Sequence, residues 1–316
     1  MRATGFSIVI ARGRASGREL PGLVEYFDRR YRRRKMKGAS PRSSEQYQIA
    51  LRKFEAWGTE PTVAISDDQI DDVLSDMLDA GYARAYVNHH RAHCLAVVRD
   101  ARKKLDLGLP PDVEKVPEYL DAPTAWNPAE MGLLLESARG ERGRVGLVAA
   151  SCWWPALILA VYDSGARISA VMSARTATLP ASFARVYIEG RSQKNRRGRW
   201  YDLHQQTREA LRSIGPHGRL SCVFGDWPYD RTCWQWPALN HGLRRILRRA
   251  GLECGRRDLW HKIRRTTGTW IAARLGRAAA CDFLGHCDPS VTDRYLDPRY
   301  VGMPVDVTVL PRPGDP

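Results

Sequence analysis

Two short stretches near the carboxyl end decide how this chain is interpreted. Residues 260–264 read Trp-His-Lys-Ile-Arg, residues 284–286 read Leu-Gly-His, and Tyr295 follows nine residues after that second histidine. Two further features lie upstream. Residues 163–167 read Asp-Ser-Gly-Ala-Arg at the end of an apolar segment, and Lys194 opens a basic turn. Each feature carries a side chain capable of acid–base, nucleophilic or anion-binding chemistry, so their grouping needs an explanation.

Taken one at a time, each of these side chains has an ordinary structural explanation. Arg167 could satisfy carbonyls at the end of a helix. Lys194 could be a solvated turn lysine, and His261 with Arg264 could form a surface pair on a helix. Tyr295 could be an amphipathic side chain with an apolar body and a polar tip. Only the order and spacing of the whole set favour one shared site.

That ordered set resembles the signature of the tyrosine recombinase (phage integrase) family. The family pattern is an arginine after a glycine-containing turn, a lysine in a β-hairpin, an HxxR box, a Leu-Gly-His box and a tyrosine nine residues beyond. The six matching positions are Arg167, Lys194, His261, Arg264, His286 and Tyr295. The resemblance covers roughly residues 127–298. One position departs from it, because Ala170 stands where the family usually has an acidic supporting residue.

The resemblance implies a fold and a chemistry. The fold is mainly α with a small β-hairpin or sheet (α+β), in which a helical core-binding domain precedes the catalytic domain. Tyr295 would attack a DNA phosphodiester, giving a 3′-phosphotyrosyl link and a free 5′-hydroxyl. Arginine suits the non-bridging oxygens because its planar, permanently charged fork binds them in pairs. The resemblance implies that Arg167 and Arg264 bind these phosphate oxygens. It gives His261 the role of general base, His286 that of hydrogen-bond donor to the phosphate, and Lys194 that of general acid.

No cofactor is expected for this chemistry. The covalent intermediate preserves the energy of the phosphodiester bond, and the sequence contains no GxxxxGK[ST] motif for a nucleotide. We also expect no metal, because no carboxylate cluster accompanies the arginines. The resemblance also implies that four protomers would assemble on two DNA sites. Two alternatives stay open: a catalytically silent DNA-binding protein with the same fold, and an enzyme similar to type IB topoisomerases.

Composition favours a nucleic-acid partner. Fifty Lys and Arg against 35 Asp and Glu give a net charge of +15. The excess is spread along the chain, since residues 1–110 hold 20 basic and 14 acidic side chains, a net of +6. Such a surface suits double-stranded DNA. The side chains that we expect near phosphates are Arg84, His89, His90 and Arg91 on one helix, with Arg33 and Arg34 from the basic run 29–37. His89, His90 and His93 could also be taken as supplying two metal ligands one helical turn apart, but no third ligand is apparent.

Turn and capping signals divide the chain. Ser66 with Gln69 forms a capping box, and Asn127-Pro128 supplies an N-cap and a first-turn proline. We expect the linker to pack on neither domain, and the tail to be non-helical with one strand at Val305–Val309. The expected segments are a flexible basic N-terminus (1–20), a helical core-binding domain (21–108), a linker (109–124), a catalytic domain (125–298) and a C-terminal tail (299–316).

Cysteine usage and hydropathy indicate the compartment. The seven cysteines are an odd number and contain no CxxC pair. The longest apolar run, around residues 155–162, is too short to cross a bilayer. We therefore expect a cytoplasmic, nucleoid-associated protein with no membrane partner.

Overall fold

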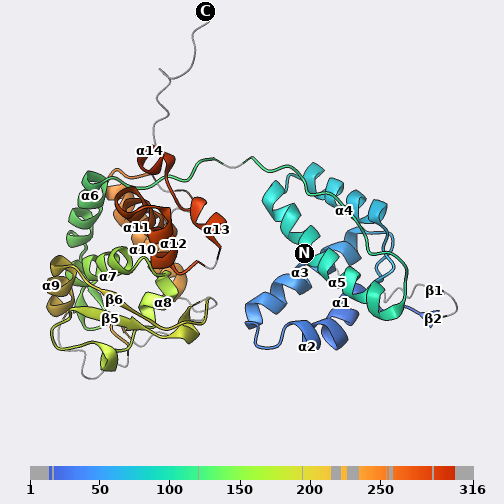
Figure 1. Ribbon diagram of the computed structural model, residues 1–316, viewed down its shortest axis with the longest axis horizontal. Helices are drawn as coiled ribbons and strands as arrows, with labels where there is room; N and C mark the ends of the chain where they lie inside the picture. The colour runs from blue at the N-terminus through green and yellow to red at the C-terminus, as the bar shows by residue number, and fades with distance from the viewer. Residues whose placement is uncertain are drawn as a thin grey trace, which may run out of the picture. The chain divides into compact units, whose positions relative to one another are not determined.

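The computed structural model divides into two compact units, Met1–Leu120 (unit 1) and Asp121–Pro316 (unit 2). Each unit has its own buried apolar cluster. Figure 1 gives the order of the elements. The residues that the structure describes are 14–15, 18–119, 121–193, 195–214, 222–225, 235–253, 255, 259–286 and 288–302.

Unit 1 is helical, as the sequence predicts. The basic run continues a helix that begins at Leu23 and passes through a π-helical turn. A two-stranded ladder precedes it. The elements are β1 (Arg14–Ala15), β2 (Arg18–Glu19), α1 (Leu23–Tyr26), η1 (Phe27–Tyr31), α2 (Arg32–Lys35), α3 (Pro41–Trp57), α4 (Asp67–Asp79) and α5 (Arg84–Leu105).

Helix α4 illustrates how the sequence sets these boundaries. The Ser66 hydroxyl accepts from the Gln69 amide, and the Gln69 side chain accepts from the Ser66 amide, so the predicted capping box is confirmed. One face of the helix, including Ile70, Val73 and Met77, is buried in the unit 1 core. Its opposite face carries aspartates.

The expectation that the linker packs on neither domain is wrong for residues 109–119. Residues 109–119 lie along α5, and Val113 is buried in the unit 1 core. Polar side chains of α5 bind successive groups of the segment, because an arginine fork fits a backbone carbonyl as readily as a phosphate oxygen. The contacts are Arg102 with the Leu109 carbonyl, Arg99 with Pro111, Arg91 with Val113, Asn88 with Val116 and Arg84 with Pro117.

Unit 2 is built around the apolar helix α7, which contacts α6, α9 and α11. Residues 153–161 of α7 are all buried, so the helix needs neighbours on every side. The elements are α6 (Pro128–Arg139), β3 (Arg144–Val145), β4 (Val148–Ala149), α7 (Ala150–Ser164), α8 (Ile168–Met172), η2 (Thr176–Thr178), β5 (Arg185–Ile188), η3 (Gly190–Ser192), β6 (Arg199–Asp202), α9 (Gln205–Ser213), α10 (Gln235–Arg249), α11 (Trp260–Leu275), α12 (Arg277–Leu284), α13 (Pro289–Asp293) and α14 (Pro298–Val301).

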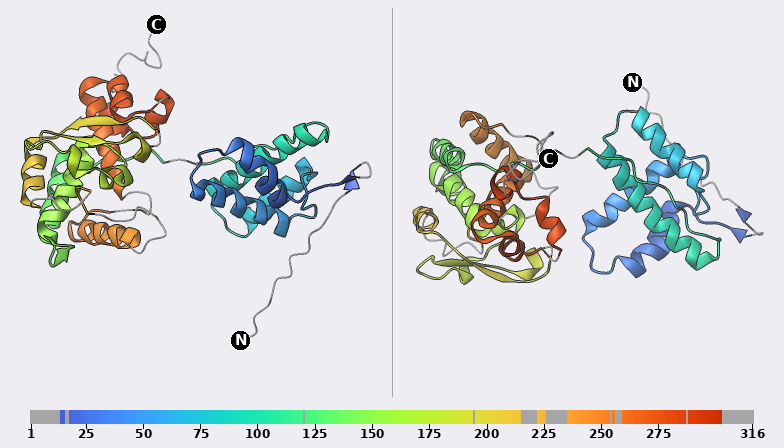
Figure 2. Two further views of the ribbon diagram at one scale, coloured as in Figure 1. Left: turned by 90° about the horizontal axis from the view of Figure 1, so that it is seen from below. Right: turned by 45° about the horizontal axis from the view of Figure 1, so that its top comes forward.

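The mainly α fold with a small β-hairpin is confirmed. The predicted hairpin is β5–β6, paired antiparallel from Arg185 with Asp202 to Ile188 with Arg199, and it lies at one side of unit 2 (Figure 2). The predicted N-cap at Asn127 also forms, with Pro128 in the first turn. No sequence pattern predicts the short hairpin β3–β4 or the short helices α8 and α13, because elements this brief hold too few residues to show a period.

One expectation about the tail is wrong where the structure describes it. Residues 298–301 form a helical turn, α14, where a non-helical tail is predicted. The Asp297 carboxylate caps this turn by accepting from the Arg299 amide, and Pro298 occupies the first helical position. The predicted strand at Val305–Val309 lies outside the described residues. Among the helices of the described ranges, none is long and apolar enough to cross a membrane.

Candidate active site

Arg264 is the centre of the site. It lies on α11, it is only 3% exposed, and its guanidinium donates to the carbonyls of Gly165 and Leu284. The Leu284 contact is 2.8 Å, and the same nitrogen lies 3.0 Å from Nε2 of His286. From α11, Arg264 therefore joins two segments that are far apart in sequence: the turn after α7 and residues 284–286, where α12 ends.

The turn after α7 depends on a glycine. Gly165 ends α7 in the left-handed conformation with φ +55°. A Cβ at this position would lie 3.0 Å from the Phe283 ring, 3.2 Å from Leu284 and 3.3 Å from Thr267. Only glycine combines this backbone conformation with such close approach. The carbonyl that holds Arg264 is thereby brought within reach of α11.

Arg167 follows two residues later and adds a second positive charge. It is partly buried at the N-cap of α8. Burial, and then the charge of Arg167, lower the pKa of the Arg264 guanidinium to about 10. Within the described residues no carboxylate pairs with either guanidinium. Ala170, where the family pattern has an acid, is buried and offers no charge. Two like charges thus lie close together without a counter-ion from the described part of the chain.

His286 is held in one tautomer. Its Nδ1 lies 2.9 Å from the Thr292 hydroxyl, and its Nε2 faces the Arg264 guanidinium. Because arginine can only donate, Nε2 must accept, and the proton resides on Nδ1. Burial, followed by the charges of Arg264 and Arg167, lowers the pKa of the His286 imidazole to about 4. The ring is therefore neutral near pH 7, and both nitrogens are engaged. Its role as donor to a phosphate stays a prediction and requires the Arg264 contact to open.

We expect the neutrality of His286 to be measurable by NMR. The ring should stay neutral as the pH falls from 8 to 5 and take up a proton with a midpoint near pH 4. The unfolded chain binds that proton near pH 6.5, so the folded state loses stability as the pH falls from about 6.5 to 4. A titration of histidine side-chain signals, with His286→Asn to assign the resonance, tests this. A midpoint at or above 6.5 would contradict the described contacts.

Tyr295 lies beside these groups, in the turn after α13. Its ring centroid is 5.0 Å from that of His286 and 5.6 Å from the Arg264 guanidinium carbon. Its amide donates to the Thr292 carbonyl at 2.7 Å. Thr292 therefore contacts both His286 and Tyr295, and it is 1% exposed. Thr292 is not among the site residues predicted from the sequence. Its position six residues after the histidine and three before the tyrosine is the signal that could have found it.

Lys194 lies outside the described residues, but its two neighbours are described. The Asn195 side chain donates to the Gly285 carbonyl at 3.2 Å, next to His286. The Gln193 side chain donates to the Ile188 carbonyl at 3.3 Å and accepts from the Tyr201 hydroxyl at 3.4 Å. The β5–β6 connection is thus anchored beside the site. The role of Lys194 as general acid stays a prediction.

His261 lies on α11, one turn before Arg264, and its side chain is exposed. The same helix therefore carries both members of the HxxR box, with the histidine toward solvent and the arginine buried. Its role as general base stays a prediction.

The residues expected near DNA phosphates do not share one exposed face. Arg84 and Arg91 bind linker carbonyls, and His90 is 2% exposed. Arg34 is bonded to Asp100 and Tyr26. His89 and Arg33 are exposed. In the described residues no three His, Cys, Asp or Glu side chains are grouped to hold a metal, and the His89 ring packs edge-on against His93.

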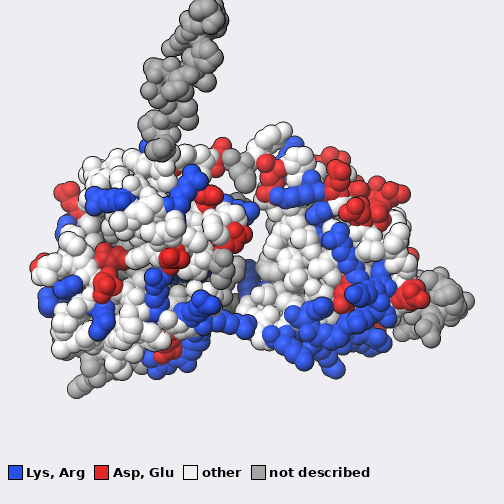
Figure 3. Space-filling model, in the orientation of Figure 1, with Lys and Arg blue, Asp and Glu red and all other residues white. Residues whose placement is uncertain are grey.

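An exposed basic patch lies over η1 and α2, and Figure 3 shows it on the lower surface of unit 1. Acidic side chains gather instead over α4. We name the first surface the α2 patch. It consists of Arg29, Arg30, Arg32, Arg33, Arg34, Lys35 and Lys37, all of them exposed.

The chain has the fold of the tyrosine recombinases. It is similar to a lambda integrase tetramer bound to a Holliday junction (TM-score 0.69, 14% identity, covering 91% of this chain and 80% of that one). It is also similar to the Tn1549 transposon integrase in complex with circular intermediate DNA (0.66, 12%, 87% and 95%). A third similar structure is the XerH site-specific recombinase bound to its difH substrate (0.59, 16%, 82% and 78%). By sequence, the chain matches no family model and no curated protein.

Proposed function

We propose that this protein is a site-specific DNA recombinase that cuts and rejoins DNA through a 3′-phosphotyrosyl intermediate on Tyr295. The observation that carries the proposal is the Tyr295 ring lying beside the buried Arg264 guanidinium and His286. Arg167 adds a second positive charge there, and no carboxylate from the described residues neutralises the two arginines. Two positive charges held close together repel each other, and a negatively charged phosphodiester bound between them would relieve that repulsion. The recombinase fold supports the same reading.

The arginines supply charge stabilisation in this proposal. Arg264 is already oriented by the carbonyls of Gly165 and Leu284, so its guanidinium has little rotational freedom left to lose when the substrate binds. Negative charge grows on the non-bridging oxygens as the phosphorus is attacked. A preoriented donor of this kind contributes about a hundredfold or more in rate.

The remaining steps are proton transfers. The Tyr295 oxygen bonds to phosphorus while the bond to the 5′-oxygen breaks, and that leaving oxygen takes a proton. We assign the removal of the phenol proton to His261 and the protonation of the leaving oxygen to Lys194. Rejoining reverses the step, when a 5′-hydroxyl attacks the phosphotyrosine. The proposal needs no nucleotide or metal, because the phosphotyrosyl bond retains the energy of the bond that was cut.

Duplex DNA is the proposed partner, with four protomers acting on two sites. The α2 patch is the surface of unit 1 that we assign to the DNA backbone. Contacts from such side chains to phosphates are insensitive to sequence and weaken with salt. Of the residues expected from the sequence, Arg33 and Arg34 belong to this patch, and His89 on α5 is also exposed.

The test is a covalent-trapping assay. Purified protein is mixed with nicked duplexes from the DNA flanking its own gene, without metal or ATP, and compared with Tyr295→Phe. We expect a denaturation-resistant protein–DNA band that the variant loses completely. Tight binding with no covalent band would favour the catalytically silent alternative. Relaxation of supercoiled DNA of any sequence would favour the topoisomerase-like one.

A further inference from the structure

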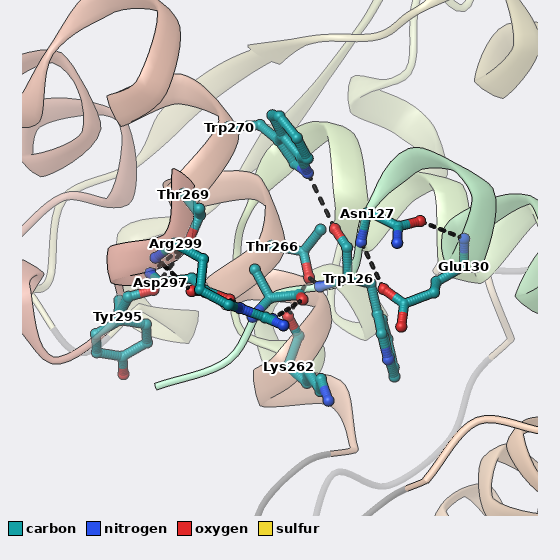
Figure 4. A network of polar contacts seen from close by, with 11 residues as sticks. Trp126, Asn127, Glu130, Lys262, Thr266, Thr269, Trp270, Tyr295, Asp297 and Arg299 are labelled. Atoms are coloured by element: carbon teal, nitrogen blue, oxygen red, sulfur yellow. Dashed lines mark hydrogen bonds and ion pairs between the residues drawn. The ribbon is translucent and has the colours of Figure 1, made fainter. Parts of the chain in front are cut away.

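We propose that Asp297 is a positioning residue for Tyr295. Asp297 ties Tyr295 to the entry segment, residues Ala125 and Trp126, where the chain enters unit 2. The inference rests on the proposed function of Tyr295 but concerns a contact network outside the six motif positions. Figure 4 shows this network. Asp297 lies two residues after Tyr295 and is 1% exposed. A carboxylate so completely buried must have its charge and lone pairs satisfied by protein groups.

The partners of the Asp297 carboxylate come from two segments. The amide of Ala125 donates to it at 2.7 Å. Arg299 donates through its own amide at 2.9 Å and through its guanidinium at 2.7 Å. The Arg299 guanidinium also donates to the Ala125 carbonyl at 3.3 Å. The Asp297–Arg299 pair therefore holds both backbone groups of Ala125.

A threonine of α11 fixes the other side of the same segment. The Thr269 hydroxyl donates to the Tyr295 carbonyl at 3.3 Å and accepts from the Asp297 amide at 3.0 Å. Thr269 is fully buried. The backbone from Tyr295 to Asp297 is thus held between α11 and Ala125.

The next residue of the entry segment is bound to α11 as well. The Trp126 amide donates to the Thr266 hydroxyl at 3.0 Å, and its carbonyl accepts from the Trp270 indole at 3.0 Å. All four backbone groups of Ala125 and Trp126 therefore have partners, and three of these partners belong either to α11 or to Asp297. Helix α11 also carries Arg264. The entry segment, the Arg264 guanidinium and Tyr295 therefore share one hydrogen-bonded frame.

Asp297→Asn tests the proposal with little change in shape. An amide presents one oxygen and one NH2, and the NH2 would face the donors of Ala125 or Arg299. We expect the 295–297 segment to loosen and the single-turnover rate of Tyr295–DNA adduct formation to fall by about tenfold to a hundredfold, as misplacement of a reacting group does. The dissociation constant for DNA should stay within about twofold, because no phosphate-binding group is altered.

The matched control is Asp293→Asn. Asp293 lies two residues before Tyr295, but its carboxyl is 55% exposed, and among the described residues its one ion pair is with an exposed arginine, Arg277, at 3.5 Å. Its adduct rate should equal that of the wild type. If both variants change the rate equally, or if neither does, the positioning role of Asp297 is wrong.

A second readout separates positioning from general damage to the site. Hydrogen peroxide can attack the phosphate in place of the phenol in a Tyr295→Phe background. We expect Asp297→Asn to leave that peroxide-dependent cleavage unchanged, since Arg264 and its carbonyl partners are untouched. If Asp297→Asn abolishes peroxide-dependent cleavage as well as adduct formation, the proposal is overturned. Thr269→Val, which removes the other anchor, should give the same pattern if Asp297→Asn fails to fold.

A third readout does not depend on catalysis. Hydrogen exchange in the free protein should be faster at the amides of Ala125 and Asp297 in Asp297→Asn than in Asp293→Asn. Unchanged exchange overturns the positioning role even if the enzyme is active. If exchange is faster in Asp297→Asn but even the wild-type protein never links to DNA, the hydrogen-bonded frame is supported and the proposed function is wrong.

Discussion

Replacing Arg264 by lysine is expected to slow Tyr295–DNA adduct formation by at least about a hundredfold. The guanidinium reaches the Gly165 carbonyl, the Leu284 carbonyl and His286 Nε2 at once because its donors are fixed in a plane. A lysine ammonium is a single point on a flexible stem and cannot serve all three partners. The substituted side chain would therefore neither hold the turn after α7 nor present the same donors to a phosphate.

The same change should also cost stability. Two buried carbonyls compete for fewer donors, and a buried polar group left without its partner costs about 1–3 kcal/mol. Single-turnover kinetics with a nicked duplex measures the rate, and denaturant unfolding measures the stability. Arg274→Lys is the control, because Arg274 is an exposed arginine on the same helix and should change neither. An Arg264→Lys variant that is as fast as Arg274→Lys would remove Arg264 from the chemistry.

Gly165→Ala is expected to destabilise unit 2 by roughly 2–5 kcal/mol, from left-handed strain of about 1–2 and overpacking of about 1–3 kcal/mol. The residue has φ +55°, and the new methyl would lie within 3.3 Å of Thr267, Leu284 and the Phe283 ring. Any backbone shift that relieves these contacts moves the carbonyl that holds Arg264. The variant should therefore lose adduct formation together with stability.

Gly132→Ala is the matched control for this prediction. Gly132 lies within α6, and a Cβ there meets nothing within 4 Å. Alanine in a helix interior should stabilise by about 0.5–1 kcal/mol. Tryptophan fluorescence during denaturant unfolding reports mainly on unit 2, because nine of the ten tryptophans follow residue 120. If the two variants unfold at the same denaturant concentration, the described packing around Gly165 is wrong.

The fold and the centre of the site were within reach of the sequence because local signals carry them. The capping box at Ser66 and the first-turn proline at Pro128 each act within a few residues. The Arg264, His286 and Tyr295 cluster was indicated by the resemblance of its order and spacing to the tyrosine recombinase signature. Its members come together because the glycine turn at Gly165 and the end of α12 both present carbonyls to α11.

The features that could not be predicted from the sequence depend on contacts between distant segments. Arg84 and Arg91 carry the same charge whether they meet a phosphate or a carbonyl, so nothing in the pattern revealed that they bind the linker. Thr292 and Asp297 are common turn and cap residues. Only the structure shows that Thr292 contacts His286 and that Asp297 binds the Ala125 amide.

Identifying the residue that is joined to DNA is the most direct measurement. The trapped complex would be digested with protease and nuclease, and the remaining nucleotide-bearing peptide sequenced by mass spectrometry. We expect a peptide containing Tyr295, with the phenolic oxygen joined to a 3′-phosphate and a free 5′-hydroxyl on the opposite end of the cut strand. Attachment at any other residue, or through a 5′-phosphate, would contradict the proposed chemistry of this site.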